Sequence, residues 1–233
     1  MKTLRSIFLL CAAILVSASS LRAQNCFGVL LKEGGGFEMT NFDGKGKSVG
    51  TLKYRFVSVR DESGFTVADI ELESFSSKGK SEYKQKFTMK CNGNESMIDA
   101  RSMVMEEQLK SFDSYKMTLT SNDIVYPNQF QVGQTLKDAS LKGSGDMSGI
   151  PIEFDMQITD RKVVSKEKIK VGAGEFDAFK ITAHNKMMNK TVVTINVDFE
   201  TVSYRAPGVI WDIKTETYRK GKLIAASELT KIY

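Results

Sequence analysis

The stretch that best predicts the fold is Lys168-Ile-Lys-Val-Gly-Ala-Gly-Glu-Phe-Asp-Ala-Phe-Lys-Ile181. It contains a run that ends at Val171, the turn residues 172–174, and a second run that carries Phe176 and Phe179. Two β-rich runs on either side of a short glycine-containing turn are typical of a β-hairpin. The stretch contains no nucleophile, metal-ligand cluster or phosphate-binding loop, so it predicts architecture and not activity.

The same succession of runs and turns continues through most of the chain. Apolar and polar side chains alternate from residue 150 to 158, and again from 193 to 199. A period of two predicts strands with one buried and one solvent-facing side. An unbroken series of such strands must curl to bury its apolar face. We therefore predict a mainly β fold, a large curved antiparallel sheet in the form of a half-barrel or open barrel.

One segment departs from this period. Apolar residues spaced by three and four positions predict a single short helix over about 102–114, with Asp99 or Ser102 as its cap. We expect this helix to close the concave face of the sheet. It either fills that face, or its flexible side chains form the wall of an apolar ligand cavity. The candidate ligand-binding residues are Met103, Met105, Leu109 and Phe112.

Residues 1–23 predict a cleaved secretory signal peptide. Two basic residues precede the ten-residue apolar run 7–16, and small residues follow it up to Ala23. The run is about half the roughly 20 residues that a membrane-spanning helix needs, so we do not expect a spanning protein. Lipid attachment at Cys26 is a minor alternative, because the residues just before it are polar. We predict export to the periplasm or the outer surface, with cleavage near Ala23.

Residues 24–233 predict a single β-rich domain, because no linker rich in Pro, Ser or Gly interrupts them. Removal of the signal peptide takes away three basic residues and no acidic one, which lowers the formal net charge from +5 to +2. Nucleic-acid binding needs clustered positive charge, so we expect no nucleic-acid partner.

Cleavage would leave two cysteines, Cys26 and Cys91. Two cysteines in an oxidising compartment predict one disulfide, and the alternative is a pair of free thiols. The chain has no C-x-x-C sequence, so we do not expect a redox site.

Residue types that carry catalysis or hold metals are sparse. His184 is the only histidine, so a hydrolase triad would have to be built on it, and we expect an exposed polar residue instead. One histidine and two paired cysteines are a poor supply of transition-metal ligands. Glu153 and Asp155 would lie on the solvent-facing side of one strand. Gly34-Gly35-Gly36 matches no phosphate-binding pattern and predicts a turn. We predict no catalytic residue, no metal and no cofactor.

Four segments carry a family resemblance. In chain order they are Tyr126-Pro127 with Val132-Gly-Gln-Thr-Leu-Lys-Asp138; Ile158-Thr-Asp-Arg-Lys-Val163; Val171-Gly-Ala-Gly-Glu-Phe-Asp-Ala-Phe-Lys-Ile181; and Glu216-Thr-Tyr218 through Gly221-Lys-Leu223 to Ser227-Glu-Leu229.

With these segments the chain resembles the TapB-like family of uncharacterised secreted proteins, a domain of unknown function common in Bacteroidota. The family usually has a proline at the position of Gly172. The resemblance implies a secreted β-rich domain akin to the half-barrels of periplasmic lipoprotein carriers. It implies no established activity and no catalytic residues.

Three functional hypotheses follow. The first is a non-enzymatic exported protein that binds an apolar small molecule, a lipid-like molecule or an envelope protein in its concave face. The second is an envelope structural or assembly protein with a packed core and no ligand. The third is a hydrolase that uses His184 or a carboxylate pair. The volume of the cavity beneath residues 102–114 distinguishes the first two.

Overall fold

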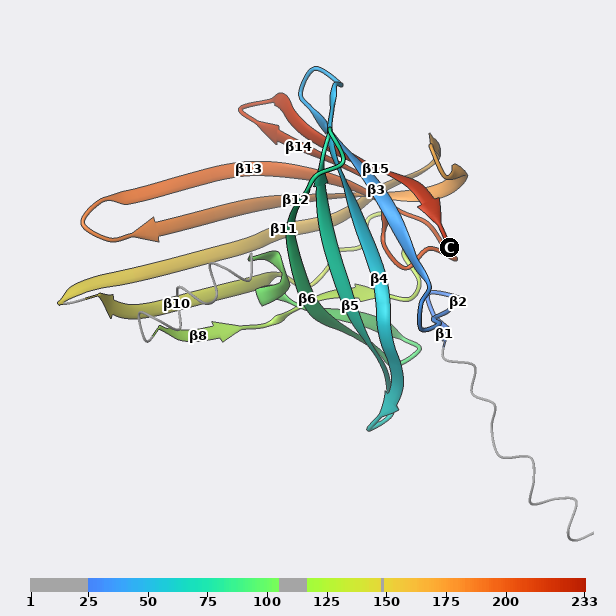
Figure 1. Cartoon of the computed structure of the whole chain (residues 1–233), viewed down its shortest axis with the longest axis horizontal. Coiled ribbons are helices and arrows are strands. Elements are labelled where there is room, and N and C mark those ends of the chain that lie inside the picture. Colours follow the sequence, from blue (N-terminus) through green and yellow to red (C-terminus); the bar gives the residue numbers. More distant parts are fainter. Residues whose placement is uncertain (1–24, 105–116, 148) are drawn as a thin grey trace, which may run out of the picture.

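The computed structural model describes residues 25–104, 117–147 and 149–233, which are almost entirely β-structure (Figure 1). Thirteen strands form one sheet in the order β8-β10-β11-β12-β13-β14-β15-β3-β4-β5-β6-β7-β9, and β1 and β2 form a small separate ladder. The elements are β1 Asn25–Cys26, β2 Val29–Leu30, β3 Gly36–Asp43, β4 Ser48–Glu62, β5 Phe65–Ser76, β6 Ser81–Cys91, β7 Glu95–Asp99, the 3₁₀ helix η1 Ala100–Met103, β8 Thr118–Ser121, β9 Asp123–Pro127, β10 Ala139–Met147, β11 Ile150–Val171, β12 Gly174–Lys190, β13 Thr194–Arg205, β14 Asp212–Arg219 and β15 Lys222–Ile232.

Every neighbouring pair in the large sheet is antiparallel, and the sheet is nearly closed into a barrel. The prediction of a curved antiparallel sheet is therefore confirmed. In Figure 1 the strands β3–β6 run steeply across β10–β13, and buried residues of both groups belong to one core. The arrangement is that of a sheet folded over so that its two halves pack face to face.

The hairpin predicted at 168–181 joins β11 to β12. Val171 lies opposite Gly174, which leaves the two-residue turn Gly172-Ala173. The turn rests on β15, where the Ala173 N–H donates to the Leu229 carbonyl at 3.0 Å. A Cβ atom on Gly172 would lie 3.1 Å from the Thr230 side chain. This glycine therefore permits a close approach to a distant strand, which the turn pattern alone did not predict.

The interior is filled by apolar and aromatic side chains. The rings of Phe37 and Tyr54 stack with centroids 4.4 Å apart, and the indole of Trp211 lies 5.2 Å from Tyr54 and 5.9 Å from Phe87. Burial also raises the pKa of the Tyr54 hydroxyl. Such aromatic pairs add about 0.5–1.5 kcal/mol each to the stabilisation that comes from buried area.

The predicted disulfide joins Cys26 and Cys91, whose Cα atoms are 5.8 Å apart and which are both buried. It connects β1 to the end of β6 across 65 residues. By loop entropy a closure of this length stabilises the fold by about 4 kcal/mol.

The helix expected over 102–114 falls mostly on residues 105–116, outside the described part of the chain. Asp99 is the cap of η1, and its carboxylate accepts the Arg101 N–H at 2.8 Å. Val104, the residue that follows η1, has an extended backbone conformation. Within the described residues, the element that closes the sheet is an extended segment and not a helix.

That segment is 118–127, which contains β8 and β9. Its first half pairs with β10 and its second half with β7, so the same stretch lies at both ends of the strand order. Asn122 is the junction. Its backbone N–H donates to the Ser140 carbonyl at 3.1 Å, its side-chain amide donates to the Asp138 carbonyl at 2.9 Å, and its amide oxygen accepts the Ser140 N–H. The Asn122 side chain therefore supplies hydrogen bonds at the point where the segment passes from pairing with β10 to pairing with β7.

Arg161 lies at the same place, which we call the seam: the point where the segment 118–127 passes from pairing with β10 to pairing with β7. A β-bulge in β11 shifts the register next to this residue, and Asp160 has a φ of 53° there. The Arg161 guanidinium that follows is buried. The Arg161 Nη1 donates to the carbonyls of Val125 at 3.1 Å and Lys137 at 2.5 Å. Its Cζ also lies 4.6 Å from the centre of the Tyr126 ring. The guanidinium thus connects β9 to the start of β10.

We expect Arg161→Met to lower the free energy of unfolding by about 3 kcal/mol, because it leaves two carbonyls at the seam unpaired. Arg161→Lys should recover only part of this loss, since an ammonium cannot reproduce the planar fork over Tyr126. The measurement is the midpoint of chemical denaturation. Arg55→Met is the control, because Arg55 pairs with Glu71 at an exposed site and should cost less than about 1 kcal/mol. An Arg161→Met protein as stable as the wild type would contradict this role.

Candidate functional site

The residues predicted to bind a ligand lie at the limit of what the structure describes. Met105, Leu109 and Phe112 fall outside the described residues, and of Met103 only its place at the end of η1 is described. Their role stays a prediction. The described neighbour of this region is Gln85, which is buried and donates through Nε2 to the carbonyls of Ser102 at 2.9 Å and Val104 at 3.0 Å.

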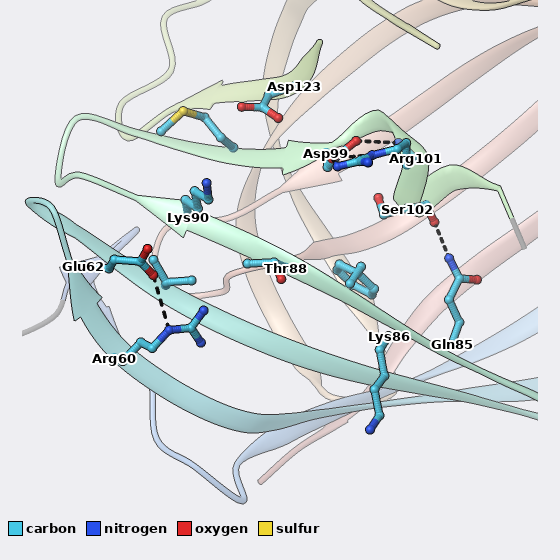
Figure 2. Close-up of a pocket in the computed structure, with 13 residues that line it drawn as sticks. Arg60, Glu62, Gln85, Lys86, Thr88, Lys90, Asp99, Arg101, Ser102 and Asp123 are labelled. Atoms are coloured by element: carbon cyan, nitrogen blue, oxygen red, sulfur yellow. Dashed lines mark hydrogen bonds and ion pairs between the residues drawn. The ribbon is translucent and has the colours of Figure 1, made fainter. Parts of the chain in front are cut away.

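A groove of about 510 Å³ lies beside η1 (Figure 2). Side chains from β4, β5, β6, β7, η1 and β9 line it, and seven of the thirteen lining residues are charged. Two ion pairs occupy its walls, with Arg60 3.4 Å from Glu62 and Arg101 bonded to Asp99. Figure 2 shows Lys86 and Lys90 on the β6 side. The described walls next to Ser102 are therefore mixed, because the apolar Val67, Phe87 and Met97 lie among seven charged residues.

Asp69 on β5 forms hydrogen bonds with Arg60 and Thr88, two residues that line the groove. Its carboxylate accepts hydrogen bonds from Ser58 at 2.7 Å and Thr88 at 2.9 Å, and a further one from Arg60. Burial raises the pKa of Asp69, but the bonds from Ser58, Thr88 and Arg60 outweigh it, and the pKa lies below its usual value of 3.8. The Asp69 carboxylate therefore links the neighbouring strands β4, β5 and β6 through side-chain hydrogen bonds on the outer face of the sheet.

We expect Asp69→Asn to reduce stability by about 1 kcal/mol at pH 7. Because the folded pKa is lowered, the unfolded chain takes up the proton first as the pH falls. The contribution of Asp69 is therefore present above about pH 4 and is lost as the pH drops through the folded pKa. Unfolding midpoints measured from pH 7 to pH 2 should fall less steeply for Asp69→Asn than for the wild type. Asp177→Asn, which removes one exposed carboxylate, is the control, and a slope for Asp69→Asn no shallower than that of the control would refute the assignment.

A second pocket, of about 350 Å³, is largely apolar. Rings and branched side chains from β3, β4, the segment before β14, and the C-terminus form its walls, and the glycine triplet 34–36 forms a further side. Exposed Lys32 and Glu33 lie at its rim. The apolar lining residues are Val29, Phe37, Phe56, Val209, Ile210 and Ile232, with Tyr233 beside them.

Backbone bonds fix this pocket in place. The Gly34 N–H donates to the Phe56 carbonyl, and the Phe56 N–H donates to the Gly35 carbonyl, each at 2.8 Å. Gly36 and Tyr233 exchange two further bonds, at 2.8 and 3.0 Å. A Cβ atom on Gly36 would lie 2.0 Å from the Tyr54 carbonyl oxygen, so only glycine fits. The triplet predicted as a turn therefore also joins β4 to the C-terminus.

His184 lies on β12 and is bonded to Asp198 of β13 through Nε2, at 2.6 Å from Oδ1. A hydrolase would also need a nucleophile within reach of this base. Its cross-strand neighbours are Thr159 and Glu200, and the Thr159 hydroxyl donates to Asp160 at 3.4 Å. The structure therefore places an imidazole and a carboxylate together but shows no activated nucleophile among the described residues.

Sequence reasoning missed the apolar pocket. Its walls come from four separate parts of the chain, and only the glycine triplet stood out in the sequence. Among the described residues no helix is long and apolar enough to cross a membrane, and no group of three or more potential metal ligands gathers.

The fold is shared with two solved structures. A candidate lipoprotein from Parabacteroides distasonis superposes with a TM-score of 0.68 at 20% identity, covering 90% of this chain and all of the other. A candidate exported protein from Bacteroides fragilis with a YmcC-like fold gives a TM-score of 0.64 at 19% identity, covering 87% of this chain and 96% of the other.

No curated protein matches the chain. The model of one family does match, and it does so over residues 32–229, which include all four segments of the resemblance described above. The chain belongs to the DUF3108-like family.

Proposed function

We propose that this protein is an exported, non-enzymatic binding protein that holds the apolar part of a small amphiphile in the pocket beside Gly34–Gly36. The observation that carries the proposal is the pocket itself. Its volume of about 350 Å³ lies at the lower end of the range for small-molecule sites, and its walls are mostly apolar. The groove beside η1 is larger, but seven of its thirteen lining residues are charged.

The rim of the pocket favours an amphiphile over a pure hydrocarbon. Lys32 and Glu33 are exposed at its edge, while Phe37 and Phe56 lie deeper in the core. An acyl or other apolar chain would contact the rings, and a polar head would stay at the rim in water. The ligand class is therefore a molecule with one apolar end.

Export is supported by three observations. The sequence predicts a signal peptide over residues 1–23, and a disulfide persists only in an oxidising compartment. The two solved structures of this fold are a candidate exported protein and a candidate lipoprotein. We place residues 24–233 in the periplasm or on the outer surface, as a single domain.

A packed envelope or assembly protein is the second candidate. It is favoured by the aromatic packing of the core, where Tyr54 and Trp211 contact each other and both contact Phe37 and Phe87. In that case the pocket would stay empty in the protein purified from cells.

The test is Ile232→Glu, which places a charge in the apolar pocket. Ile232 is 53% exposed, so the change should leave the fold intact. We expect binding of a fluorescent long-chain fatty acid to weaken by about tenfold or more, because a carboxylate replaces apolar contact area. Fluorescence titration measures the dissociation constant, and native mass spectrometry of the exported protein identifies any amphiphile that co-purifies.

Ile224→Glu is the matched control. It lies on the same strand, is 46% exposed and is not a lining residue, so its affinity should equal that of the wild type. Equal weakening by both changes would indicate non-specific adsorption. A wild-type protein that neither binds the probe nor carries an amphiphile would support the packed envelope protein instead.

A further inference from the structure

Strand β13 pairs with β12 along its whole length, but with its other neighbour, β14, along only part of it. It pairs with β12 from Thr194 to Arg205, but β14 pairs with it only from Glu200 onward. Within the described residues, the backbone from Thr194 to Phe199 therefore has a strand on one side alone. Figure 1 shows this part of β13 in the long hairpin that projects beyond β14.

The free edge also exposes apolar side chains. We expected the alternation in 193–199 to bury one face of the strand, and for two residues this is wrong. Val193 is 66% exposed and Ile195 is 59% exposed, because the hairpin extends past the elements that would cover them. Val197 and Phe199 on the same face are only partly covered.

Other exposed edges carry the usual protection against strand pairing. The described ladder between β6 and β7 covers only Met89–Cys91, and the uncovered part of β6 presents exposed Lys84 and Lys86. The end of β4 beyond its ladder with β3 presents Arg60 and Glu62. Charged side chains of this kind discourage edge-to-edge association.

The free edge of β13 has no such protection. Between Thr194 and Phe199 there is no lysine, arginine or proline, and the one charged side chain, Asp198, is bonded to His184. An edge that is apolar on one face and unprotected on its backbone is a template for another strand.

We infer that this edge pairs antiparallel with the same edge of a second copy of the chain, about a twofold axis at Val197. Residues that face each other in an antiparallel pair point to the same side of the sheet. Under this register Ile195 lies opposite Phe199 of the partner, and Val197 lies opposite its own copy. The other face sets Asn196 opposite Asp198, so no two like charges meet. The inference concerns assembly and goes beyond the proposed ligand site.

The length of the free edge selects this register. Pairing stops at Glu200, where β14 takes the place of the partner. A twofold axis at Asn196 would pair Ile195 with Val197 but would leave Phe199 opposite the hairpin turn at Val193. Only the axis at Val197 uses all three apolar residues of the segment.

Cysteine cross-linking tests the register in the exported protein. Val197→Cys places two thiols on opposite strands at the twofold axis, and mild oxidation should convert most of the protein to a covalent dimer. Asn196→Cys is the control one residue away. Its thiols would be offset by two positions and should cross-link poorly. Failure of Val197→Cys to cross-link, or preferential cross-linking of Asn196→Cys, would overturn the inference.

Ile195→Lys tests the surface without relying on a disulfide. The twofold axis places the substitution in two cross-strand pairs, so the dimer dissociation constant should rise by about tenfold or more. Sedimentation equilibrium measures this constant. Thermal unfolding at concentrations well below the wild-type dissociation constant, where the protein is monomeric, should be unchanged since Ile195 is exposed. Ile224→Lys, which is exposed on β15, is the control and should leave dimerisation unaffected. A wild-type protein that stays monomeric at high concentration, or an Ile195→Lys protein that still dimerises as the wild type does, would refute the inference.

Discussion

Closure of one antiparallel sheet on itself is the constraint on which the rest of this structure depends. A sheet with open edges leaves backbone N–H and C=O groups without partners. Here the segment 118–127 bonds to β10 with its first half and to β7 with its second. The ladder is interrupted where the chain crosses from one partner to the other, and side chains replace the missing bonds. Asn122 supplies them at the crossing, and Arg161 supplies them to the carbonyls of Val125 and Lys137.

A buried guanidinium at the seam imposes further requirements on the sequence around it. Arg161 lies in a bulge, and its cation lies against Tyr126, whose ring also lies 3.9 Å from the Cζ of the buried Arg205. Asp212 lies 3.4 Å from Arg205 and partly offsets the two positive charges. Three of the segments that carry the family resemblance meet in this region, and their residues Leu136, Val163 and Ile181 form a small core of their own. Three of the four segments of the resemblance therefore contribute side chains to the region where the sheet closes.

Local patterns were enough to predict the strands, the turns and the disulfide, because each depends on near neighbours or on a single pair of residues. The hairpin at Gly172 is the clearest example. Contacts between distant strands were beyond such patterns. Nothing local to Gly172 indicates Thr230, and nothing local to Gly36 indicates the Tyr54 carbonyl. The apolar pocket was missed for the same reason, since its walls come together only after closure. The exposure of Ile195 was missed because alternation predicts which residues share a face, but not whether another element covers that face.

A sheet that is nearly closed around an apolar core also limits where recognition can occur. The aromatic contacts among Phe37, Tyr54 and Trp211 fill part of the core, and the apolar pocket begins at Phe37, where this packing ends. The pocket beside Gly34–Gly36 is such a margin, formed where the C-terminus meets the start of β3. The free edge of β13 is another, formed because one strand is longer than its neighbour. Both lie where the regular pairing of strands ends. In this fold the regular ladder provides stability, and the places where it stops provide the surfaces open to ligands and partners.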